Sequence, residues 1–141
     1  MRIERESLLY EPVSRYVRRR RFTRQSPEAP FFEYRMDLYA FSPRESLTIA
    51  VELKLRRWRR ALQQALIYQL CADMVYVALP AASVARVDQD VFRHHGVGLI
   101  AVRSPRRCVE VVPARKSSVM RSHYRDHFVN SLTTRGINGG R

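Results

Sequence analysis

Two acids and a lysine occupy positions in the chain where they could support metal-assisted chemistry. Over residues 47–55 apolar side chains take the odd positions, so Glu52 and Lys54 point to the other face of a predicted strand. Charges on such an apolar strand are costly unless something compensates them. A bound cation and a phosphate group would do so.

The second acid, Asp37, lies in an aromatic-rich strand predicted over residues 31–41, and a short turn at 42–46 joins the two strands as a hairpin. If the turn is centred near Arg44 and Glu45, Asp37 lies opposite Glu52. A slip of one residue would turn Asp37 to the other face. In the expected register two carboxylates and one ammonium converge, a set that suits Mg²⁺ or Mn²⁺ with waters and phosphate oxygens.

The remaining pattern predicts an α/β protein with a mixed central sheet flanked by helices. Apolar residues at helical spacing indicate helices over 4–20, 58–72, 82–94 and 117–132, and short apolar runs indicate strands over 74–79, 97–102 and 108–112. The strand–helix–strand unit from 47 to 79 favours parallel pairing. Two prolines predict a loop over 25–30, and the glycines predict a disordered tail over 136–141.

The order Asp37, then Glu52-x-Lys54 fifteen residues later, then a helix and a short apolar strand resembles the PD-(D/E)XK nuclease superfamily. Gln64-x-x-x-Tyr68 on that helix resembles the motif of RecB-like members, and the run 96–102 looks like the end of MmcB-type DNA-repair proteins. Met36 stands where the superfamily pattern has proline. The resemblance covers roughly residues 6–112. It implies a restriction-endonuclease-like core over 1–115, followed by a basic extension over 116–141.

The resemblance also implies roles for individual residues. Asp37 and Glu52 would bind the metal ion, Lys54 would be the catalytic lysine, and the first helix would supply a further acid. We expect Glu11 to be that acid, with Glu6 as the alternative. Supporting residues and nucleic-acid contacts complete the expected site: Gln64, Tyr68, Arg56, Arg57, Arg59 and Arg60.

The charge favours a polyanionic partner, because 26 Lys and Arg residues stand against 13 Asp and Glu residues, a formal net charge of +13. The implied function is therefore a Mg²⁺-dependent DNA endonuclease in repair or processing. The alternatives are a nucleic-acid-binding module that kept the fold without catalysis, and a basic structural protein of a nucleoprotein assembly. Whether two chains pair as a homodimer to cut both strands stays open.

Other features of the chain bound its location and its metals. No apolar run approaches the roughly 20 residues of a membrane helix, and the basic start lacks a signal peptide's apolar region, so we expect a soluble, cytoplasmic protein. Cys71 and Cys108 lie in apolar segments and are expected to be buried thiols. His123 and His127, four residues apart, are a weaker rival metal site.

Overall fold

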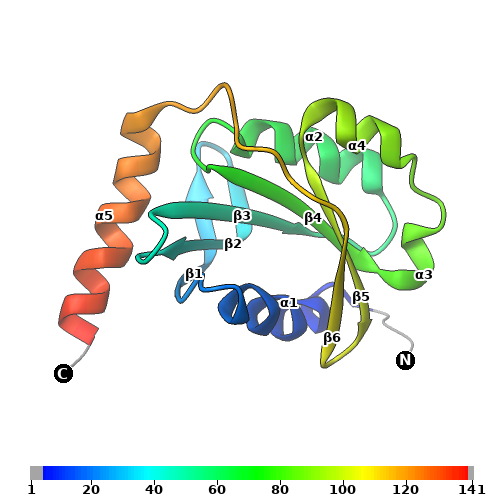
Figure 1. Cartoon of the computed structure of the whole chain (residues 1–141), viewed down its shortest axis with the longest axis horizontal. Helices are drawn as coiled ribbons and strands as arrows, with labels where there is room; N and C mark the ends of the chain where they lie inside the picture. Colours follow the sequence, from blue (N-terminus) through cyan, green and yellow to red (C-terminus); the bar gives the residue numbers. More distant parts are fainter. Residues whose placement is uncertain (1–4, 140–141) are drawn as a thin grey trace.

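Six strands form one mixed sheet in the computed structural model, which describes the backbone of residues 5–139 and side chains as far as residue 134 (Figure 1). The strands lie side by side in chain order. Their bounds are β1 (Arg24–Phe31), β2 (Tyr34–Ser42), β3 (Leu47–Leu53), β4 (Met74–Pro80), β5 (Gly98–Ser104) and β6 (Arg107–Val112). The helices are α1 (Ser7–Arg19), α2 (Trp58–Tyr68), α3 (Ala81–Val84), α4 (Gln89–His95) and α5 (Ser122–Gly139).

The strand directions follow from the lengths of the connections. Short turns join β1 to β2, β2 to β3 and β5 to β6, and these three pairs are antiparallel. Helical crossovers join β3 to β4 and β4 to β5, and these pairs are parallel. The predicted α/β class, with a mixed sheet between helices, is confirmed.

Helices cover both faces of the sheet, because each face carries its own set of alternating apolar residues. On one face α1 buries Leu9, Val13 and Val17 against strand residues that include Ile49 and Val51. The opposite face is covered by α2 and α4, with α5 at one side (Figure 1). Its buried residues include Trp58, Leu62, Phe92, Phe128 and Leu132.

The segment predicted as a loop over 25–30 is instead part of β1, so that prediction was wrong. β1 is an edge strand, paired on one side with β2. Pro27 and Pro30 lack N–H donors, which an edge strand tolerates because it needs a donor toward one neighbour only. Ala29 and Phe31 are buried against the core and hold the strand in place. β1 ends at Phe31 and a short turn follows, so the second strand, predicted over 31–41, begins at Tyr34.

Two predicted helices also differ in extent. The helix expected over 82–94 is interrupted between Val84 and Gln89, where the Asp88 carboxylate accepts a hydrogen bond from the N–H of Asp90 at 3.1 Å and starts α4 anew. Gly96, at φ 73°, ends it. The last helix continues through Gly139 where a disordered tail was expected, and residues 140–141 of that predicted tail lie outside the described residues.

The two cysteines differ in burial. Cys71 is buried, as predicted, whereas Cys108 is only partly buried, and both are free thiols. Burial raises the pKa of the Cys71 thiol to about 12.

Within residues 5–139, no helix has both the length and the apolar character needed to cross a bilayer.

Candidate active site

The hairpin of β2 and β3 brings the two acids together. Its register pairs Leu38 with Val51 and so brings Asp37 level with Glu52, as the position of the turn predicted. The N–H of Leu53 donates to the Asp37 carboxylate at 2.7 Å and fixes its orientation. The two carboxyl groups lie close enough for each to affect the pKa of the other. The expected pair of acids therefore exists as one local structure.

Glu52 is the more enclosed of the two acids, with 5% of its surface exposed. The Tyr68 hydroxyl donates to its Oε1 at 3.2 Å and also lies 3.4 Å from the carbonyl oxygen of Arg35. Burial, and then the nearby charge of Asp37, raise the pKa of Glu52 to about 8, against opposing effects of Tyr68 and Lys54.

Burial also raises the pKa of Asp37, although the Leu53 N–H favours its charged form. Two neighbouring carboxyl groups whose pKa values are both raised resist carrying two negative charges together. Without a cation, the pair therefore holds a proton into the neutral pH range. A positive ion beside the two groups would favour the charged form of each and so oppose both shifts.

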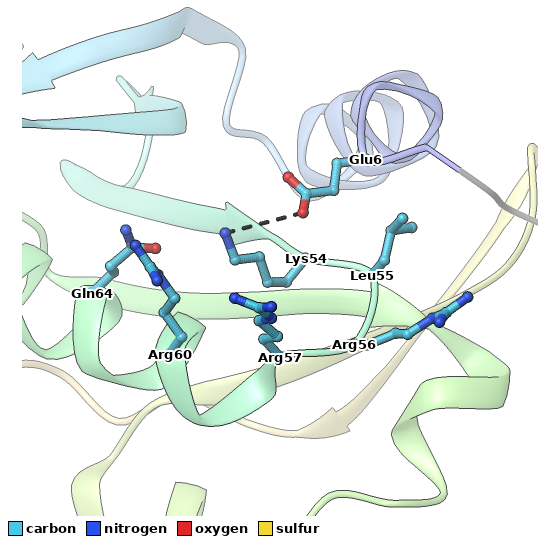
Figure 2. Close-up of a pocket in the computed structure, with 7 residues that line it drawn as sticks. All are labelled: Glu6, Lys54, Leu55, Arg56, Arg57, Arg60 and Gln64. Carbon is cyan, nitrogen blue, oxygen red and sulfur yellow. Dashed lines mark ion pairs between the residues drawn. The ribbon is translucent and has the colours of Figure 1, made fainter.

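Lys54 follows the last residue of β3, where its backbone N–H still donates to the Ala78 carbonyl oxygen at 3.1 Å. Its ammonium group lies 4.0 Å from Glu6 Oε1, at the start of α1 (Figure 2). Glu6 and Lys54 both line a pocket of about 550 Å³. The lysine is thus held beside the carboxylate pair by an acid from a different part of the chain.

That acid is Glu6, whereas we expected Glu11. Glu11 is exposed and forms an i,i+4 ion pair with Arg15 at 3.5 Å. The cause is the rotation of α1: its buried face, with Leu9 and Val13, turns Glu11 outward, whereas Glu6 at the N-cap position extends toward Lys54. The fold therefore places Glu6, the alternative predicted from the sequence, at the site.

Gln64 and Tyr68 lie one turn apart on α2, as their spacing predicted, and both reach the site. Tyr68 contacts Glu52, and Gln64 lines the same pocket as Lys54 (Figure 2). Among the described side chains, the buried Oε1 of Gln64 has no hydrogen-bond partner. The Arg35 carbonyl oxygen beside Tyr68 was not anticipated, because a backbone oxygen leaves no signal in residue type.

The predicted arginines divide into two groups. Arg57 and Arg60 point toward Lys54 and Gln64, whereas Arg56 points away from them, and all three line the pocket (Figure 2). Arg59 is outside it and stacks its guanidinium 4.3 Å from the ring centroid of Trp58.

Asp37 and Glu52 fit the needs of a Mg²⁺ ion, which takes one or two carboxylates and fills its other positions with water and phosphate oxygens. A larger ligand set is not assembled, since no cluster of three or more His, Cys, Asp or Glu side chains with metal-binding geometry occurs in the described part of the chain. His123 and His127 are exposed on α5 beside Tyr124 and Phe128, and no third His, Cys, Asp or Glu joins them in a metal-binding cluster among the described residues.

Comparison with known proteins shows the fold alone. The sequence matches no family model and no curated protein. A solved structure of a protein of unknown function from Silicibacter pomeroyi superposes with a TM-score of 0.73 at 17% sequence identity. The alignment covers 98% of this chain and 90% of the other. The same arrangement of strands and helices therefore occurs in a natural protein of very different sequence.

Proposed function

We propose that this protein is a Mg²⁺-dependent DNA endonuclease of the PD-(D/E)XK type, with a restriction-endonuclease-like core, acting in DNA repair or processing. The observation that carries the proposal is the adjacent pair of acids, Asp37 and Glu52, brought level by the β2–β3 register, with Lys54 two residues beyond Glu52. Burying Glu52 beside a second carboxyl group costs stability, and such unfavourable placements are concentrated at functional sites. A nuclease site is one that uses such a pair of acids.

Asp37 and Glu52 would hold the metal ion. When bound, Mg²⁺ supplies a Lewis acid that polarises a phosphoryl oxygen and lowers the pKa of a water molecule. The protein contributes preorganisation. The Leu53 N–H orients Asp37, and the Tyr68 hydroxyl orients Glu52, so neither acid must reorganise as the reaction proceeds.

Lys54 supplies a positive charge beside the acids. Its ammonium can orient the attacking water or offset negative charge that grows on the phosphate as the bond to the leaving oxygen breaks. Glu6, 4.0 Å away, restrains the lysine without burying it. Lys54 keeps partial exposure, at 20% of its side chain, so a substrate phosphate can reach it.

DNA as substrate fits the net charge of +13 and the arginines around the pocket. A cytoplasmic location fits two free cysteines, since disulfides form mainly in oxidising compartments. Pairing of two chains would supply a second site for the other strand.

The decisive experiment compares Lys54→Ala with Lys116→Ala, which removes the same charge from an exposed position. Plasmid and linear DNA are incubated with each protein and Mg²⁺ or Mn²⁺. We expect Lys54→Ala to slow cleavage by about 10²- to 10³-fold, the usual effect of losing one group that stabilises charge in the transition state. Lys116→Ala should cut like the parent.

Equal cleavage by the parent and Lys54→Ala would contradict the proposal. A parent that binds DNA, cuts none and shows no Glu52-dependent calorimetric signal with Mg²⁺ would instead be a non-catalytic binding module. Circular dichroism spectra of the variants confirm that the fold is retained.

A further inference from the structure

A second depression adjoins the site, and five arginines line it among the residues that the structure describes. It measures about 930 Å³ and lies between the start of α2 and the segment that follows β4. We call it the arginine groove, and its lining residues are Arg56, Arg57, Trp58, Arg59, Arg60, Ala82, Ser83 and Arg86. The pocket beside Lys54 shares three of these arginines, Arg56, Arg57 and Arg60. The groove is therefore continuous with the candidate active site.

Among the described residues, none compensates the charges of the groove. All five arginines are exposed, and none takes part in an ion pair within the described residues. No acid of the described part of the chain lines the groove. Five neighbouring guanidinium groups repel one another, and a polyanion would relieve that repulsion.

Contacts below the arginines hold the two walls of the groove in position. The Ser83 hydroxyl donates to the Leu55 carbonyl oxygen at 2.5 Å, which ties the segment after β4 to the segment after β3. Trp58 is buried, with 7% of its surface exposed, and its ring carries the guanidinium of Arg59. Arginines on a fixed framework lose less freedom when they bind phosphate.

On the other side of the site the charge is reversed. A pocket of about 370 Å³ includes Asp37. Of the residues that the structure describes, three acids and no basic residue line it: Glu6, Glu28 and Asp37, with Ser7, Tyr10, Pro27 and Leu53. A phosphate backbone would be repelled there and attracted to the arginine groove. We therefore expect a bound strand to run from the site toward the arginine groove and away from the acidic pocket.

We propose that the arginine groove binds the phosphodiester backbone of the substrate strand on one side of the bond that is cut, and that Arg86 is a phosphate-binding residue within it. The inference rests on the proposed function for the place of the cut, but not for binding. Arg86 comes from the segment after β4, far from the arginine run 56–60 in the sequence. The ligand chemistry is a phosphodiester chain, which DNA and RNA share.

The test separates binding from cleavage. Lys54→Ala is used as the background with a chelator present, so that no strand is cut. Affinity for single-stranded DNA, duplex DNA and RNA of one sequence is measured over a range of salt concentrations. Arg86→Ala is compared with Arg44→Ala, an exposed arginine in the turn at the opposite end of β3.

We expect Arg86→Ala to weaken binding and to lower the slope of log affinity against log salt by about 1, as loss of one phosphate contact does. Arg44→Ala should leave the slope unchanged. The type of nucleic acid for which the slope depends on Arg86 is the one that the groove binds. Arg59→Ala provides a second, independent measure of the same groove.

Equal slopes for Arg86→Ala and Arg44→Ala with all three nucleic acids would overturn the inference. If the Arg86 effect is seen but the parent cuts no DNA with metal, the groove stands and the proposed nuclease function fails. In an active parent, Arg86→Ala should raise KM while kcat is kept, because it removes binding rather than chemistry.

Discussion

The burial of Glu52 beside a second acid is the feature that most favours a functional role for the site over a structural one. A glutamate that is 5% exposed, beside a second carboxyl group, has its charged form disfavoured by both burial and repulsion. Tyr68 donates one hydrogen bond to it, which offsets only part of this effect. We infer that the fold tolerates this unfavourable placement because Glu52 binds the metal ion of the proposed site.

The pKa of Glu52 leads to a prediction about stability. Its usual value is 4.5 and its value in the folded protein is about 8, so folding takes up a proton between these limits. The stability that this provides is complete below the lower pKa and is lost as the pH rises through the higher one. Without divalent cations, the free energy of unfolding should therefore fall between about pH 5 and 8.

Urea denaturation with a chelator present measures this dependence. Glu52→Gln should flatten it, whereas Glu45→Gln, an exposed acid in the β2–β3 turn, should not. An unchanged pH dependence in Glu52→Gln would show that another group is responsible. Added Mg²⁺ should bind more tightly as the pH rises, because it competes with the shared proton.

At the scale of elements, one buried carboxylate anchors the start of β3. Asp73 is buried before β4 and accepts hydrogen bonds from the N–H and the hydroxyl of Thr48, at 2.8 and 2.9 Å. It also pairs with Arg125 of α5, whose Nε lies 3.0 Å from its carboxylate. One carboxylate thus joins β3, β4 and α5.

Asp73→Ala should destabilise the protein by about 3 kcal/mol, since it leaves the charge of Arg125 and the donors of Thr48 without their partner. Asp126→Ala, an exposed acid on the same helix as Arg125, serves as the control. Urea denaturation of both variants measures the effect. Similar stabilities would mean that the contacts of Asp73 contribute little.

Considered as a whole, the molecule includes its last helix in the main core. Phe128 of α5 is 7% exposed, and its ring centroid lies 4.5 Å from that of Tyr39 in β2. Leu132, one turn later, is 3% exposed. The helix therefore covers part of the sheet that would otherwise face water.

Phe128→Ala should lower the free energy of unfolding by about 3 kcal/mol or more, because it removes a large buried side chain and leaves a cavity. Asn130→Ala, at an exposed position of α5, should change it by less than about 0.5 kcal/mol. Thermal unfolding distinguishes the two. A loss below about 1 kcal/mol for Phe128→Ala would mean that α5 docks only loosely.

The sequence by itself determined the parts of the site that depend on local geometry. Alternation places Glu52 on one face of its strand, and a short turn of known position sets the register that brings Asp37 to it. Helical spacing likewise puts Gln64 and Tyr68 on one side of α2. These relations involve neighbours along one hairpin or one helix, where backbone geometry leaves few alternatives.

Only the tertiary structure decided which distant groups join them. The choice of Glu6 over Glu11 follows from the rotation of α1 on the sheet, and the addition of Arg86 to the groove follows from the path of the chain after β4. β1 forms as an edge strand, despite its two prolines, because β2 is available to pair with it. The first two outcomes rest on packing between segments far apart in sequence, which residue spacing does not encode. The third rests on strand pairing that overrides the local propensity of the prolines.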